Sequence, residues 1–153
     1  MSRVKVENIR HRLSSDDAIS LAADSSVSLK HSASAKLTTT STGVVVSGEA
    51  VFQKEITETV FAITDASSVA LDPINGMIQT WTLGANRTAT DSLSTGQSML
   101  LIITASSSNY TLTWPTMKWS GGSAPTLGGA NPTAIELFKV GSQLYGATVG
   151  DLA

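Results

Sequence analysis

The chain has 153 residues, with 10 Lys and Arg against 12 Asp and Glu, a formal net charge of −2 and no cysteine. This balance lacks the strongly basic character of nucleic-acid-binding domains, and the absence of cysteine excludes disulfides and thiolate metal sites. The most hydrophobic run, residues 99–104, is far too short to span a bilayer, and the N-terminal MSRVKVENIR has no apolar signal-peptide core. We therefore expect no nucleic-acid partner, no membrane association, and synthesis in a cytoplasm.

Hydroxyl side chains dominate the composition. The chain holds 22 Ser and 19 Thr, whereas charged residues make up only 14%, below the roughly 25% usual for soluble domains. Threonine favours strands through its branched Cβ, and serine favours turns through bonds to the nearby backbone. The composition therefore predicts an all-β protein without long amphipathic helices.

The first fifty residues consist of short units. Val4, Val6, Ile9 and Leu13 lie among basic groups, an ambiguous pattern that is compatible with a short strand followed by one or two helical turns. Short extended pieces then recur every eight to ten residues between Ser, Asp and Gly turns, as expected for repeated short strands. We predict strands at residues 18–22, 27–30, 36–39 and 44–46.

From about Phe52 the units become longer and more apolar. The run 98–105, SMLLIITA, is nearly continuous in its apolar residues and predicts a central strand buried on both faces. We expect two domains, 1–50 and 51–153, the second a β-sandwich or a jelly-roll-like knob. The other predicted strands of this part are 55–63, 77–83, 110–114, 135–140 and 144–149.

The apolar residues of the first fifty positions are too few to support a fold on their own, so we expect them to be shared between identical chains. Intertwined copies would bury a common apolar face and pair strand edges that would otherwise be exposed. The predicted interface residues are Ile19, Leu21, Val27, Leu29, Leu37, Val44, Val45 and Val46.

Two stretches resemble phage virion proteins. GQSMLLIITASSSNYTLTWPTMKWSGGSAPTL, together with IELFKVGSQLYGATVG, resembles the C-terminal β-domain of many tail fibre and head fibre proteins. KLTTTSTGVVVSG, residues 36–48, resembles the trimeric shaft segments of such fibres. The resemblance implies a homotrimeric virion component on the outer capsid surface or the tail, made in the cytoplasm of a bacterial host.

Only about fifty residues precede the predicted knob, which is short for a fibre with an attachment module and a long shaft. We therefore expect a capsid decoration (cement) protein or head fibre that stabilises the head, with the major capsid protein or another virion protein as its partner. The alternative is a short tail fibre or baseplate-type protein that binds a host surface glycan.

Two groups of side chains are candidate contact sites. Arg3, Lys5, Arg10 and Arg12 would anchor the chain to an acidic virion surface; the alternative is an ordinary solvated terminus. Trp119, beside a glycine-rich loop, is the candidate glycan contact, since an exposed ring can stack on a sugar, although packing is the more frequent role of tryptophan.

Enzyme chemistry has little support in the sequence. His11 and His31 have no Asp or Glu at the spacing of a metal site or a catalytic triad. Asp16 and Asp17 are adjacent, which suits a turn or a helix cap and not a pair of carboxylates that converge on one substrate. We therefore predict no catalytic residue, no metal and no cofactor, and expect that the protein is not an enzyme.

Overall fold

The computed structural model describes residues 8–10, 17–107 and 110–152. These residues form strands and one short 3-10 helix, η1 (Pro73–Asn75), so the prediction of an all-β protein is confirmed. The chain divides into an N-terminal unit, Met1–Ile56, and a C-terminal unit, Thr57–Ala153. The sequence analysis placed the boundary a few residues earlier, between residues 50 and 51.

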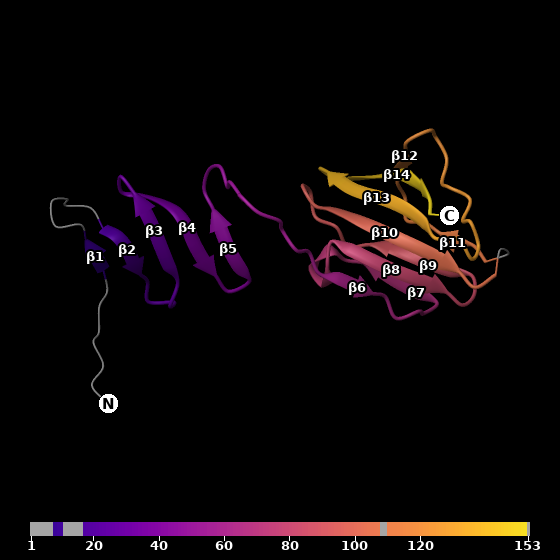
Figure 1. Cartoon of the computed structure of the whole chain (residues 1–153), viewed down its shortest axis with the longest axis horizontal. Coiled ribbons are helices and arrows are strands. Elements are labelled where there is room, and N and C mark those ends of the chain that lie inside the picture. Colours follow the sequence, from indigo (N-terminus) through magenta and orange to yellow (C-terminus); the bar gives the residue numbers. More distant parts are fainter. Residues whose placement is uncertain (1–7, 11–16, 108–109, 153) are drawn as a thin grey trace, which may run out of the picture. The chain divides into compact units, whose positions relative to one another are not determined.

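The N-terminal unit is a single antiparallel sheet in which each strand pairs with the next along the chain (Figure 1). Ser32 and Ala33, both with positive φ, make the two-residue turn between the third and fourth strands, a conformation that matches the twist of a hairpin. All four strands predicted between residues 18 and 46 are present. The strands of this unit are β1 (Asn8–Arg10), β2 (Asp17–Leu21), β3 (Val27–His31), β4 (Ser34–Thr40) and β5 (Gly43–Val46).

In the C-terminal unit the chain alternates between two sheets. One sheet has the order β12-β14-β13-β10-β8-β6 and the other has the order β11-β9-β7 (Figure 1). The strands are β6 (Val60–Ala62), β7 (Ser68–Leu71), β8 (Ile78–Leu83), β9 (Arg87–Asp91), β10 (Ser98–Ala105), β11 (Leu112–Thr113), β12 (Lys118–Trp119), β13 (Thr133–Val140) and β14 (Gln143–Asp151).

The connectivity of this unit differs from the antiparallel order that a jelly roll requires. β6, β8 and β10 are parallel neighbours in the larger sheet, and β7, β9 and β11 are parallel neighbours in the smaller one. The chain therefore winds from one sheet to the other and ends with the antiparallel hairpin of β13 and β14. Alternation of apolar and polar residues is the same in either pairing, so the sequence pattern did not reveal this winding.

One hydrophobic core lies between the two sheets of the C-terminal unit. The larger sheet contributes alternate residues of β10, among them Leu101 and Ile103, and the smaller sheet contributes Leu71 and Ala89. The predicted strand 98–105 is confirmed, but its expected burial on both faces is wrong for the single chain, because every second residue is only half-buried.

Candidate functional site

An apolar row crosses all five strands of the N-terminal sheet. Residues that pair directly across an antiparallel sheet have their side chains on the same face. The register therefore places one apolar side chain from each strand side by side. In strand order, the row is Ile9, Ile19, Leu29, Leu37 and Val46.

A second row lies on the same face, displaced by two residues from the first row in β2, β3, β4 and β5. Leu21 pairs with Val27, and Thr39 pairs with Val44. The backbone N–H of Val27 donates to Oγ1 of Thr39 at 2.9 Å, which joins the two pairs. We call the two rows together the N-terminal apolar face.

The opposite face of this sheet is rich in hydroxyl groups. Ser20 pairs with Ser28, and Ser28 pairs with Thr38. The hydroxyl oxygens of Ser28 and Thr38 lie 3.2 Å apart, within hydrogen-bond distance. The sheet is therefore amphipathic, because strand alternation sends the aliphatic side chains to one face and the hydroxyl groups to the other.

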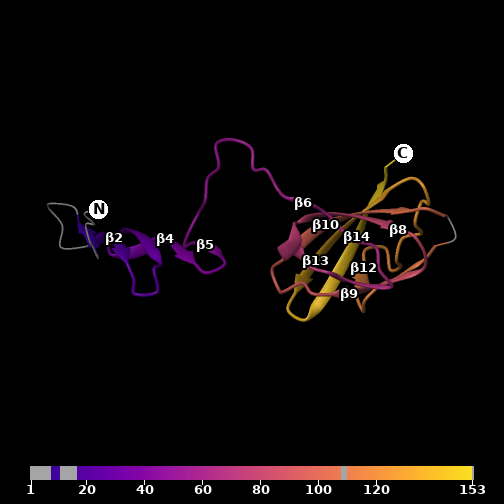
Figure 2. The ribbon, with the colours of Figure 1, turned by 90° about the horizontal axis from the view of Figure 1, so that it is seen from below.

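The N-terminal apolar face has no cover among the described residues of its unit. None of those residues is buried, and Leu29 and Val44 are 42% and 57% exposed. Figure 2 shows the sheet as a single layer. An apolar sheet face has to be buried against another element to stabilise a fold in water, so this face is the leading candidate for an interaction surface.

The structure brings together seven of the eight residues predicted for an interface between chains. Val45 is the exception, since it pairs with Thr38 and so lies on the hydroxyl-rich face. Ile9 joins the face although the prediction omitted it. Ile9 was missed because its neighbours in the sequence are polar. Val45 could have been excluded, because alternation along a strand places the middle valine of VVV on the opposite face from the other two.

The predicted attachment residues fall mostly outside the description. Arg3, Lys5 and Arg12 lie outside the described residues. Arg10 is described only as the end of β1, where its backbone pairs with Asp17. Of the other candidates, His31 ends β3, and His11 and Asp16 lie outside the described residues.

Trp119 is half-buried in β12, where it packs on its own unit. Its ring meets that of Trp114 edge to face, with the centroids 4.9 Å apart. A Cβ atom built on Gly146 of the paired strand would lie 2.7 Å from the Trp119 ring, so the glycine leaves the space that the indole fills. This side chain is therefore a packing element, and its glycan-binding role stays an untested prediction.

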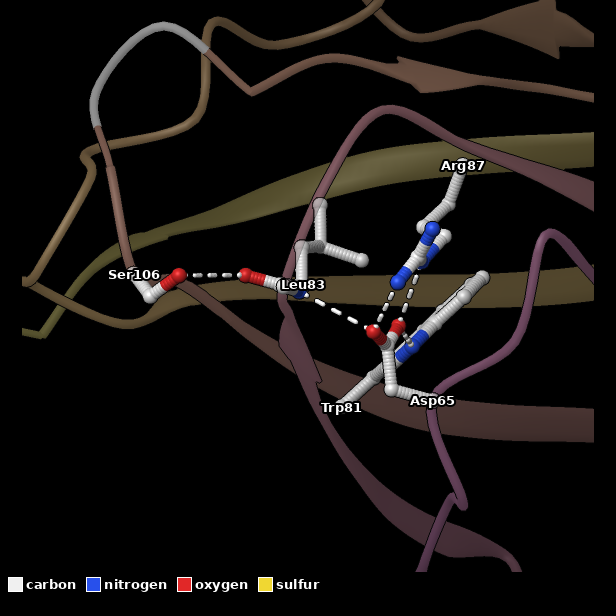
Figure 3. A network of polar contacts seen from close by, with 6 residues as sticks. Asp65, Trp81, Leu83, Arg87 and Ser106 are labelled. Carbon is white, nitrogen blue, oxygen red and sulfur yellow. Dashed lines mark hydrogen bonds and ion pairs between the residues drawn. The ribbon is translucent and has the colours of Figure 1, made fainter.

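A polar network in the C-terminal unit was not predicted from the sequence (Figure 3). Asp65 accepts hydrogen bonds from Nε of Arg87 at 2.9 Å, from Nε1 of Trp81 at 2.9 Å and from the backbone N–H of Gly84 at 3.1 Å. Nη2 of Arg87 completes a bidentate ion pair. These contacts, with the Arg87 hydrogen bonds foremost, hold the pKa of Asp65 well below its usual range.

All of the donors around Asp65 belong to the C-terminal unit, so the network joins strands of that unit. Across the described part of the chain, no three His, Asp or Glu side chains gather closely enough to hold a metal ion. No helix in that part is long and apolar enough to cross a membrane.

Comparison of the chain with protein-family models, curated proteins and solved structures finds no match in any of the three.

Proposed function

We propose that the chain is a non-enzymatic structural protein of a phage particle, a homotrimeric decoration protein or head fibre that binds the outer capsid surface and stabilises the head. The observation that carries the proposal is the uncovered N-terminal apolar face, which spans every strand of its sheet. A surface of this kind is typical of a chain that folds together with copies of itself.

Three copies can turn their apolar faces inward and enclose a shared core, with the hydroxyl-rich faces outward. Two sheets packed face to face would also cover the apolar rows. The choice of three rests on the resemblance of residues 36–48 to trimeric shaft segments, in which Leu37, Val44 and Val46 would hold the chains in register. A closed trimer also avoids the open-ended growth that a non-closing contact would produce.

The virion assignment rests on the resemblance of residues 96–127 and 135–150 to fibre β-domains. Attachment to the capsid is assigned to Arg3, Lys5, Arg10 and Arg12, because a cluster of basic groups suits an acidic surface. Only three basic residues occur after position 54, so positive charge is concentrated in the N-terminal part of the chain.

The alternative, a glycan-binding tail fibre, has less support. Its candidate contact, Trp119, uses its ring to pack against Trp114 and over Gly146, and does not stand free for a sugar to stack on. The packed arrangement favours a structural role for the C-terminal unit.

Binding to particles of the parent phage tests the proposal. We expect the purified chain to have the mass of three copies by light scattering and to co-sediment with heads that lack it, at a copy number in the hundreds per particle. A variant in which Ser replaces the four basic residues Arg3, Lys5, Arg10 and Arg12 keeps Ile9 on the apolar face. It should remain trimeric yet lose co-sedimentation. Binding to tails alone, or undiminished head binding by this variant, would contradict the assignment.

A further inference from the structure

The larger sheet of the C-terminal unit has a second face, turned away from the core, which we call the outer face. β10 supplies the clearest sign of it, since Leu100 and Ile102 alternate with buried residues and are only half-buried themselves. Strands that are apolar on both faces are typical of sheets covered on both sides. Among the described residues of this unit the outer face is covered only in part: Ala134, which pairs with Ile102, is buried, whereas Val60 and Phe138 are exposed.

The register shows that this apolar character continues across the sheet. Val60 pairs with Ile78, Ile78 with Leu100, and Leu100 with Glu136, so all four share the outer face. Val60 is 60% exposed. The face is therefore a continuous patch that mixes aliphatic residues with a single carboxylate in the row through Leu100.

Aromatic rings extend the patch toward the other edge of the sheet. Phe138 pairs with Tyr145, and their rings stack with centroids 5.2 Å apart and planes within 9°. Tyr145 in turn pairs with Lys118 of the edge strand β12, so this lysine also belongs to the outer face. Phe138 remains 38% exposed.

The charges of the outer face are separated. Glu58 and Glu136 flank a shallow depression of about 230 Å³ that Ile78 and Leu100 help to line. Partial burial, and then the charge of Glu58, raise the pKa of Glu136. Lys118, by contrast, lies at the β12 edge. The region around Glu58 and Glu136 is thus acidic, whereas the β12 edge of the same face carries the cation Lys118.

We infer that the outer face packs head to tail against the outer face of another copy of the chain, so that Lys118 of one copy approaches Glu58 and Glu136 of the next. The inference rests on the proposed self-association of the chain. Once the N-terminal sheets hold copies together, the tethered C-terminal units meet at an effective concentration in the millimolar range. A head-to-tail contact of this kind is heterologous, and it gives a closed ring such as a trimer when the rotation between copies is one third of a turn.

Cysteine cross-linking tests the inference, because the chain has no cysteine of its own. Thr80 lies on the outer face, where it pairs with Ile102. Thr88 is an exposed threonine of β9 in the smaller sheet and serves as the matched control. With a short bis-maleimide, Thr80→Cys in the full-length chain should give at least tenfold more covalent dimer than Thr88→Cys.

Charge exchange tests the proposed orientation. In the Thr80→Cys background, Lys118→Glu and Glu136→Lys should each reduce the dimer yield several-fold, and the double variant should restore it. Circular dichroism of each variant checks that the fold is retained.

The outcomes separate the two proposals. If the chain is oligomeric but Thr80→Cys cross-links no better than Thr88→Cys, the outer face does not pack on itself, and the N-terminal association stands. A strong Thr80→Cys dimer without rescue by the double variant overturns the pairing of Lys118 with Glu136. A chain that is monomeric at micromolar concentration overturns both the self-association and the inference.

Discussion

At the residue scale, the side chain of Asp65 connects several elements of the C-terminal unit through hydrogen bonds. It lies between β6 and β7, yet its carboxylate binds donors from β8, from the turn after β8 and from Arg87 at the start of β9. Its side chain and that of Arg87 are 25% and 19% exposed, so the charged hydrogen bonds are partly shielded from water. One residue thus joins both sheets of the C-terminal unit.

We predict that Asp65→Asn destabilises the C-terminal unit by about 2–3 kcal/mol, the usual value for lost hydrogen bonds to a charged group. The amide replaces one acceptor with a donor and places it against N–H groups that also donate. Urea unfolding followed by tryptophan fluorescence measures the change. Asp72→Asn is the control, because its Oδ1 can still accept from the backbone N–H of Ile74.

The same substitution should alter the pH dependence of stability. The native pKa of Asp65 lies below its unfolded value, so its contribution is complete above about pH 4 and is lost as the pH falls below that value. The stability gap between the wild type and Asp65→Asn should therefore narrow between pH 7 and pH 3. A gap that stays constant over this range would show that the carboxylate charge is not the cause.

Residue-scale features such as this were the least predictable from the sequence. Asp65 and Arg87 are 22 positions apart, and nothing in their local context marks them as partners. The space over Gly146 that Trp119 fills likewise depends on the pairing of β12 with β14. Such contacts follow from the tertiary arrangement, which short-range patterns do not contain.

At the scale of elements, alternation predicted strands well where it was regular. The strands in 18–46, β8, β10 and the final hairpin were all expected. β7 and β9 were missed because SVAL and RTATD are short and contain small or charged residues. Of the predicted strand 55–63, only Val60–Ala62 forms in the single chain.

Self-association through the N-terminal apolar face can be tested with two neighbouring residues of β3. Leu29→Asp places a charge on the apolar face, whereas Ser28→Asp places the same charge on the hydroxyl-rich face. Because an unpaired carboxylate resists burial, we expect Leu29→Asp to weaken association at least tenfold, about 1.4 kcal/mol. Ser28→Asp should leave it nearly unchanged. Sedimentation equilibrium gives both constants, and equal effects would contradict the assigned face.

At the scale of the whole molecule, each unit has an apolar sheet face that its own described residues leave at least partly exposed, although the two folds differ. The N-terminal sheet has no buried side chain in its described part, while the C-terminal unit builds a complete core between its two sheets. The C-terminal unit can therefore be stable as one chain. In the proposed trimer the N-terminal unit would gain its stability from the other copies, and we expect it to supply most of the association free energy.

Removal of residues 1–50 tests whether the N-terminal unit supplies most of the association free energy. We expect the truncated chain to keep its core and its cooperative unfolding, yet to associate much more weakly than the full chain, because only the outer face of the larger sheet remains to hold the copies. Sedimentation velocity on both chains at equal molar concentration measures the difference. A truncated chain that stays as tightly trimeric as the full chain would move the main interface to the C-terminal unit. If instead the full chain is itself monomeric, the N-terminal apolar face must be covered by a different partner.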